Sequence, residues 1–238
     1  MILKVNTSSN PAQHGAQKLR ELLDNAEGSV LCMLSGGSAF ELLQPFDISK
    51  GWERVTITVL DERYSEDEGI NNFAQLAKTD FYAKAKSGGA SFIDTRIAPS
   101  ESENELEVRF DDAVKQWLHG NPGGSIVVTM GIGADGHTAG IFPHEDDEKF
   151  RFLFEQDGRF VVGYHAHTAE YHERLTVTNH FLREHVDHAV VFAVGEGKRE
   201  AVDRVLSAHG LLSETPARII REMKDAELFT DISGLAVS

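Results

Sequence analysis

The residue types best suited to chemistry lie in one glycine-rich stretch, residues 131–143, which reads GIGADGHTAGIFP. Its middle holds Asp135 and His137, two residues apart. An imidazole exchanges a proton near neutral pH, and a neighbouring carboxylate can hold its orientation. The alternative is structural: Asp135 would cap a following helix, and His137 would pack against its neighbours. Because both interpretations suit an isolated Asp-Gly-His, the rest of the chain has to decide between them.

The position of this stretch favours a ligand-binding loop. Residues 125–130 form a short, apolar, β-branched run that is typical of a buried strand. The glycines between 131 and 136 then allow a sharp turn and a close approach of the backbone to a ligand. Loops that leave the carboxyl ends of strands are where α/β sheets usually bind their ligands.

Two other turns predict an anion site. Ser35-Gly36-Gly37-Ser38 follows a predicted strand, and Gly195-Glu196-Gly197-Lys198 follows another. Each turn leads into a predicted helix, whose N-terminus offers backbone N–H groups and a dipole that favours an anion. Taken singly, each turn is equally well explained as a plain strand-to-helix connection.

A charged triplet, Asp61-Glu62-Arg63, comes directly after the predicted strand 55–60. An arginine at a strand end suits planar recognition of phosphate or carboxylate. Asp61 would orient Arg63 or contact a substrate, and the alternative is a surface ion pair between neighbours. The acid-rich segments 62–68 and 145–148 are predicted to be solvated loops.

Alternating strand and helix patterns predict an α/β fold with a mostly parallel central sheet covered on both faces. We expect a single domain over 1–238, with a small subdomain around 140–185. The predicted strands are 2–5, 30–34, 55–60, 91–97, 125–130, 160–164, 175–178, 189–194 and 228–232. The predicted helices are 11–25, 39–44, 71–86, 102–119, 179–185, 199–208 and 216–223.

Composition limits the partners. The formal net charge is −15, which argues against nucleic acid or an anionic membrane as the main partner. The chain shows no run of about 20 apolar residues and no signal-peptide core at its start, so we expect a cytoplasmic protein. Cys32, the single cysteine, lies in an apolar run and is expected to be a buried, inert thiol.

The chain has 11 histidines, and three of them, His165, His167 and His172, lie close together. On a strand, His165 and His167 would face the same side, as a pair of metal ligands can. However, no cysteine joins them, and the H-E-x-x-H pattern is missing. We therefore expect a polar surface cluster and no metal site.

Five segments resemble the 6-phosphogluconolactonase family and occur in its order. They are LSGGS at 34–38, LDER at 60–63, GIGADGHTAGIFP at 131–143, RLTVT at 174–178 and GEGK at 195–198. The resemblance implies the three-layer α/β sandwich shared with glucosamine-6-phosphate isomerases. It also implies cofactor-free hydrolysis of 6-phosphogluconolactone to 6-phosphogluconate, the second step of the oxidative pentose phosphate pathway. The partner would be a small sugar-phosphate lactone, and the oligomeric state stays open.

The resemblance also assigns roles to residues. His137 would be the base that activates water, with Asp135 fixing the loop or the imidazole. Backbone N–H groups of the glycine turn would stabilise the oxyanion. Arg174 would face the substrate with Asp61, and the phosphate would be held by Gly36, Gly37, Ser38, Arg63 and Lys198.

Two other functions are alternatives to lactone hydrolysis. A glucosamine-6-phosphate isomerase or deaminase usually continues after Gly-His with Ile-Ala-Phe-Asn-Glu, whereas here the continuation is Thr138 to Pro143. That branch also has Asp-Glu-Tyr where this chain has Asp-Glu-Arg. A sugar-phosphate-binding protein without turnover would not need His137. Two departures from the lactonase pattern are Ala39-Phe40, where Thr-Pro is common, and Asn71-Asn72, where Ser-Asn is usual.

Overall fold

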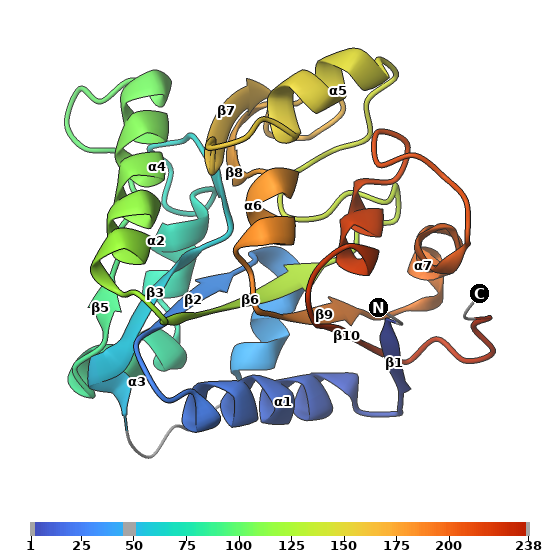
Figure 1. The fold of residues 1–238 in the computed structure, drawn as a ribbon, viewed down its shortest axis with the longest axis horizontal. Helices are drawn as coiled ribbons and strands as arrows, with labels where there is room; N and C mark the ends of the chain where they lie inside the picture. The colour runs from blue at the N-terminus through green and yellow to red at the C-terminus, as the bar shows by residue number, and fades with distance from the viewer. Residues whose placement is uncertain (1–2, 45–50, 237–238) are drawn as a thin grey trace.

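A computed structural model describes residues 3–44 and 51–236, and its centre is a seven-stranded sheet (Figure 1). The strand order is β1-β10-β9-β6-β2-β3-β5, and every pairing in this sheet is parallel. The strands are β1 Lys4–Thr7, β2 Val30–Leu34, β3 Val55–Val59, β5 Ser91–Phe92, β6 Ser125–Gly131, β9 His188–Ala193 and β10 Ala226–Thr230. The expected parallel sheet is thus confirmed.

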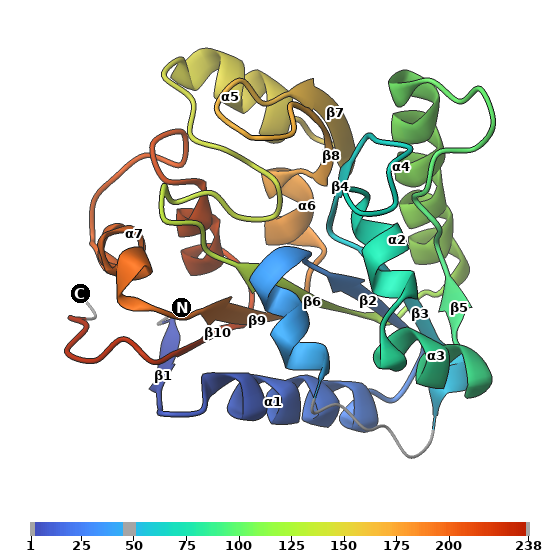
Figure 2. The same cartoon turned by 180° about the vertical axis from the view of Figure 1, so that it is seen from behind.

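Helices cover both faces of this sheet, which gives the expected three layers (Figures 1 and 2). Side chains of β2 alternate between two separate cores, because successive residues of a strand point to opposite faces. Leu31 and Met33 pack in the first core, with helices α4 (Glu103–Gly120), α6 (Asn179–Glu184) and α7 (Arg199–Leu206). Val30, Cys32 and Leu34 pack in the second core, with helices α1 (Pro11–Asn25), α2 (Asn72–Ala77) and α3 (Asp80–Ser87).

Helices α1 and α4 begin with ordinary capping residues. Asn10 caps α1, where Pro11 occupies the first turn, and Ser102 forms a capping box with Glu105 at the start of α4. The α-helices are α1 Pro11–Asn25, α2 Asn72–Ala77, α3 Asp80–Ser87, α4 Glu103–Gly120, α5 Asp147–Phe154, α6 Asn179–Glu184 and α7 Arg199–Leu206. Short 3₁₀ helices are η1 Gly37–Leu43, η2 Trp52–Arg54, η3 Glu196–Lys198 and η4 Pro216–Arg221.

A second sheet of three antiparallel strands lies on the side of the main sheet opposite α1 (Figure 1). Its strands are β4 Asp61–Arg63, β8 Glu173–Val177 and β7 Val161–His165, in the order β4-β8-β7. β4 follows β3 of the main sheet after a single residue, so the charged triplet is itself a strand. The two sheets are therefore joined at the point where β3 ends.

Several predicted boundaries were wrong for local reasons. The predicted helix 71–86 is two helices, because the Thr79 side chain accepts a hydrogen bond from the Tyr82 backbone and starts α3. The predicted helices 39–44 and 216–223 are 3₁₀ helices, and α5 was not predicted.

The predicted strands at the two ends of the sequence also shift. The first strand was predicted at 2–5 and runs over Lys4–Thr7, while Ile2 lies outside the described residues. The strand predicted at 91–97 keeps only Ser91–Phe92, and the last strand begins two residues early, at Ala226.

The strand order creates a crevice. After β2 the chain continues to β3 on one side, whereas after β6 the next strand of this sheet is β9 on the other side. The loops that leave β2 and β6 therefore diverge, although the two strands are neighbours. Such a switch point at the carboxyl edge of a parallel sheet is the usual place for a ligand.

Candidate active site

A cavity of about 280 Å³ opens at this switch point. Its walls come from the loops after β2, β6 and β9, from β4 and β8, and from the start of α2. Eight of the nine predicted site residues line it: Gly36, Gly37, Ser38, Asp61, Arg63, His137, Arg174 and Lys198. The ninth, Asp135, is not among the lining residues and contacts His137 instead.

Asp135 and His137 form a tight pair in the loop after β6. Asp135 Oδ1 lies 2.6 Å from His137 Nδ1 and also accepts a hydrogen bond of 3.0 Å from the His137 backbone N–H. Burial alone would raise the pKa of Asp135, but the hydrogen bonds from His137 outweigh it and lower the pKa. Because an ionised carboxylate only accepts, the proton of a neutral imidazole sits on Nδ1, which leaves Nε2 as a base. The next helix, α5, begins only at Asp147, so the interpretation of Asp135 as a helix cap is wrong.

The loop around this pair is held by its own backbone and by two glycines. Gly133 N–H donates to the His137 carbonyl, and Gly136, at φ 96°, bends the chain between them. A Cβ at Gly133 would stand 2.1 Å from His137 Nδ1, so only glycine leaves room for the pair. Further along the loop, Tyr164 Oη donates to the Gly140 carbonyl. The imidazole is thus fixed before any ligand arrives.

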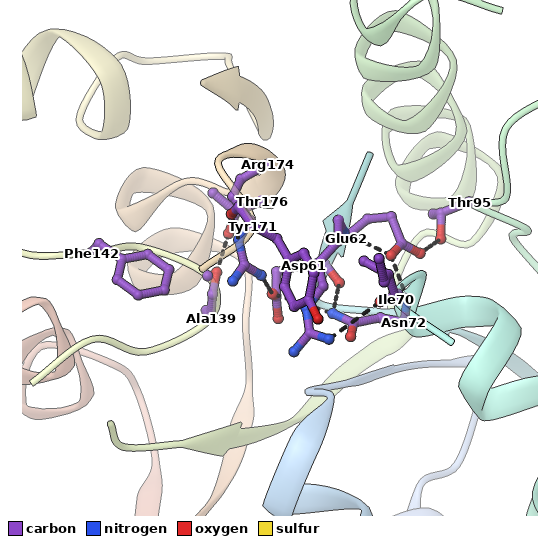
Figure 3. A network of polar contacts seen from close by, with 12 residues as sticks. Asp61, Glu62, Ile70, Asn72, Thr95, Ala139, Phe142, Tyr171, Arg174 and Thr176 are labelled. Atoms are coloured by element: carbon purple, nitrogen blue, oxygen red, sulfur yellow. Dashed lines mark hydrogen bonds and ion pairs between the residues drawn. The ribbon is translucent and has the colours of Figure 1, made fainter. Parts of the chain in front are cut away.

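Phe142 links the histidine to an arginine. Its ring stacks on the His137 ring at 4.4 Å between centroids, and the Arg174 guanidinium lies 5.2 Å from the Phe142 centroid. Figure 3 shows Phe142 near the side chain of Arg174, which belongs to β8. Phe142 has no separate predicted role, because the apolar end of the 131–143 segment is equally well explained by core packing.

Two cationic side chains come from the second sheet. Arg174 Nη1 lies 3.4 Å from Asp61 Oδ2, and its Nε donates to the Tyr171 carbonyl (Figure 3). Arg63 donates to the Ile70 carbonyl at 3.3 Å, and its guanidinium lies 5.0 Å from the centroid of the Tyr171 ring. Asp61 therefore contacts Arg174, which corrects the expectation that it orients its neighbour Arg63.

A third cation reaches the cavity from the turn after β9. Lys198 Nζ lies 3.4 Å from Ser38 Oγ, so it bridges to the glycine turn after β2. Burial lowers the pKa of Lys198, and the nearby Glu41 carboxylate opposes this shift. Three cationic side chains and one carboxylate line the cavity, so this part of an acidic protein attracts an anion.

Glu62 contradicts the prediction of a solvated loop over residues 62–68. It is fully buried and accepts hydrogen bonds from the backbone N–H groups of Arg63, Asn72 and Phe73 and from Thr95 Oγ1 (Figure 3). Burial raises its pKa to about 7, although these hydrogen bonds act in the opposite direction. Glu62 thus joins β4 to the start of α2, and both elements contribute to the cavity.

Three backbone N–H groups of the glycine turn after β6 donate within the loop. The N–H of Gly133 donates to the His137 carbonyl, the N–H of Gly136 donates to the Gly133 carbonyl, and the N–H of His137 donates to Asp135. The positive side chains of the cavity can also stabilise an oxyanion.

Two further polar residues line the cavity. Ser35 and Asn72 are buried, and each has a side-chain oxygen without a hydrogen-bond partner among the described residues. Ser35 lies in the predicted anion-binding turn, but neither residue has a predicted role of its own. The place of Asn72 depends on the contact between α2 and β4, for which the sequence carries no local signal.

Other predicted features lie away from the cavity. Cys32 is buried in the main sheet, and burial raises its pKa to about 12, as expected for an inert thiol. His165 pairs with Glu173 at 2.8 Å, and its ring lies 4.6 Å from that of His167. Within residues 3–44 and 51–236, His, Cys, Asp and Glu form no group of three or more arranged to hold a metal ion. The helices in these ranges include none long and apolar enough to cross a membrane.

This geometry supports proton transfer next to a bound anion. An oriented imidazole with Nε2 free of the Asp135 contact lies in a cavity with three cationic side chains. Such an arrangement can hold a small phosphorylated or carboxylated molecule and remove a proton from water beside it.

The chain is similar to known proteins over most of its length. The chain is 27% identical over 210 residues to the 6-phosphogluconolactonase of Neisseria meningitidis, covering 86% of this chain and 85% of that protein. It is 29% identical over 209 residues to that of Mesorhizobium japonicum, covering 84% and 78%. A crystal structure of a 6-phosphogluconolactonase from Shewanella baltica shares the fold, with a TM-score of 0.75, 24% identity and 97% of each chain covered.

The sequence profile of one family, described as glucosamine-6-phosphate isomerases/6-phosphogluconolactonase, matches residues 6–229. That span includes every residue that lines the cavity and, apart from Lys4, Val5 and Thr230, all strands of both sheets. The chain therefore belongs to the family of glucosamine-6-phosphate isomerases and 6-phosphogluconolactonases.

Proposed function

We propose that this protein hydrolyses 6-phosphogluconolactone to 6-phosphogluconate, in the oxidative pentose phosphate pathway. One observation carries the proposal: the Asp135-bound imidazole of His137 lines the same cavity as Arg63, Arg174 and Lys198. The names of the relatives support it, since similar proteins that match more than four fifths of this chain are 6-phosphogluconolactonases. The small substrate and the single buried cysteine suit a cytoplasmic protein.

The phosphate would bind between Lys198, Arg63 and the turn of Gly36, Gly37 and Ser38. Lys198 and Ser38 already contact each other across the cavity, so a phosphate oxygen can bridge both. Holding the phosphate end of the sugar fixes the lactone carbonyl relative to His137, and this orientation lowers the barrier to reaction. Since the walls of the cavity come from both sheets, we propose that residues 1–238 form a single domain.

His137 Nε2 would remove a proton from water as the water oxygen attacks the lactone carbonyl carbon. The tetrahedral intermediate carries a negative oxygen, which the positive side chains of the cavity stabilise. The bond between that carbon and the ring oxygen then breaks, and the proton passes from His137 to the ring oxygen. Asp135 keeps Nδ1 occupied throughout, so that Nε2 is the nitrogen that takes and returns the proton.

The test uses lactone generated freshly by oxidising glucose 6-phosphate, with the spontaneous hydrolysis rate subtracted. We expect His137→Ala to lower kcat by about 10²- to 10⁴-fold, which is the usual contribution of a general base. Binding of 6-phosphogluconate, measured by calorimetry, should persist in that variant. Equal rates for wild type and His137→Ala would contradict the role of His137.

An ammonia assay and the lactone assay together separate the two alternatives. An isomerase or deaminase would release ammonia from glucosamine 6-phosphate, and we expect none. A binding protein without turnover would bind 6-phosphogluconate but leave the lactone to its spontaneous rate. Lactone hydrolysis above that rate by the wild type excludes the second alternative.

A further inference from the structure

Asn72 is held in a single orientation at the start of α2. Its Nδ2 donates to the Asp61 backbone carbonyl at 2.9 Å and lies 3.4 Å from Asp61 Oδ2, and its backbone N–H donates to Glu62 Oε1 at 2.5 Å (Figure 3). Both Asp61 atoms are acceptors, so the NH₂ end of the side-chain amide has to face them. This contact fixes which end of the amide is the oxygen.

The opposite end of the amide, Oδ1, is buried and has no hydrogen-bond partner in the part of the chain that the structure describes. Asn72 is 1% exposed and lines the cavity. A Cβ on Gly36 would stand 2.5 Å from this oxygen, so the glycine keeps the space beside it open. A buried acceptor without a donor destabilises the protein unless a ligand supplies one.

We infer that Asn72 Oδ1 accepts a hydrogen bond from a hydroxyl group of the bound sugar phosphate and selects for that hydroxyl. This inference rests on the proposed function. An amide oxygen can only accept, whereas the phosphate oxygens and the lactone carbonyl of the substrate are acceptors themselves. Among the groups of the substrate, only the hydroxyl groups of the sugar can donate to Asn72. The selection is against analogues that lack this hydroxyl, because they leave Asn72 Oδ1 unpaired.

The experiment compares 6-phosphogluconolactone with its 2-deoxy, 3-deoxy and 4-deoxy analogues. For wild type we expect one analogue to lose about 10- to 100-fold in kcat/KM relative to the parent lactone. In Asn72→Ala the kcat/KM for the parent lactone should fall to the value for that analogue, so the variant no longer discriminates between the two substrates. Discrimination that is the same in both proteins for all three analogues would overturn the inference.

Two controls keep the result interpretable. Asn71→Asp changes the neighbouring asparagine, which caps α2 through its Oδ1 and is not among the lining residues of the cavity, and it should leave the discrimination intact. Calorimetric binding of 6-phosphogluconate and its deoxy forms repeats the comparison without turnover. If the wild type hydrolysed no lactone but bound one deoxy acid more weakly than 6-phosphogluconate, the proposed function would be refuted. The role of Asn72 as the acceptor for that hydroxyl would still be supported. Equal binding of all these acids by wild type would overturn the role of Asn72, even if Asn72→Ala did not fold.

Discussion

Arg63 and Arg174 lie directly opposite each other in the antiparallel pairing of β4 with β8. Residues opposite each other in such a pair project from the same face, and like charges there destabilise the pairing. Asp61 lies on the same strand as Arg63, but its carboxylate contacts Arg174. Among the described residues, no carboxylate forms an ion pair with Arg63. Positive charge therefore remains at this side of the cavity, as expected of a site in which a bound anion offsets the repulsion between the two arginines.

Anion binding should therefore stabilise the protein. At a 6-phosphogluconate concentration of 100 times Kd, the gain in unfolding free energy is about 2.7 kcal/mol, visible as a rise in Tm. We expect Arg63→Met to lose most of this rise at the same concentration, because the ligand then meets one cation fewer. Scanning calorimetry with and without ligand measures both values.

Arg96→Met is the matched control for this experiment. Arg96 is an exposed arginine that pairs with Asp94 and is not among the residues lining the cavity. Its variant should keep the full ligand-induced rise in Tm. The same rise in all three proteins would show that Arg63 does not bind the anion.

Gly133→Ala should damage catalysis without preventing folding. The added Cβ would stand 2.1 Å from His137 Nδ1 and 2.6 Å from Asp135 Oδ1, so the imidazole and the carboxylate have to separate. We expect kcat to fall by at least about 10-fold, since a misplaced base loses the benefit of orientation. Circular dichroism should show unchanged secondary structure, and lactone assays give kcat.

Gly120→Ala provides the comparison. Gly120 ends α4, and a Cβ there would meet nothing within 4 Å. This variant should retain the wild-type kcat. An unaffected kcat in Gly133→Ala as well would mean that the Asp135–His137 contact is not needed for turnover.

Local sequence patterns were sufficient for the parts of the site that sit on strand ends. The apolar run of β6 predicts a strand, and the glycines after it predict a turn, so His137 falls at the carboxyl edge of the sheet. The same argument places Gly36 after β2 and Lys198 after β9. A parallel sheet then brings these turns to one edge, and the cavity lining agrees.

Features that depend on distant partners could not be predicted in this way. Asp61-Glu62-Arg63 has no β-branched or aromatic residue, and it is a strand only because β8 pairs with it. Glu62 looks like one of several surface acids, yet its hydrogen bonds to the start of α2 bury it. Asn72 depends on the same contact. Tertiary structure overrides local propensity at these three places.

Asp135→Asn tests whether the carboxylate orients the imidazole. An asparagine can present its NH₂ group to Nδ1, which would place the imidazole proton on Nε2 and remove the base from the cavity. We expect kcat to fall by about 10²- to 10⁴-fold with KM little changed, because the loss is one of proton transfer. Steady-state kinetics on fresh lactone measures both constants.

The control for this substitution is Asp146→Asn. Asp146 is another loop aspartate, and it caps α5 by accepting from the Lys149 backbone, which asparagine also does. Its kcat should match wild type. A similarly small change of kcat in both variants would mean that Asp135 holds the conformation of the loop but does not orient the imidazole.

The buried Glu62 carboxyl should make stability depend on pH. Burial raises its pKa in the folded protein from an ordinary 4.5 to about 7. Between these values the unfolded chain loses the proton while the folded protein keeps it, so stability falls as pH rises through this window. The full loss, roughly 3 kcal/mol, is present above pH 7.

Glu62→Gln isolates this effect, because glutamine is neutral at every pH and fills nearly the same space. Its amide NH₂ group would face backbone N–H donors of Asn72 or Phe73, which lowers stability by an amount that does not change with pH. The free energy of unfolding of wild type minus that of the variant should therefore decrease by roughly 3 kcal/mol between about pH 4.5 and 8. Other titrating groups, such as Glu103, are common to both proteins and cancel in the difference. Urea denaturation at several pH values measures it, and a difference that stays constant would show that Glu62 titrates normally in the folded protein.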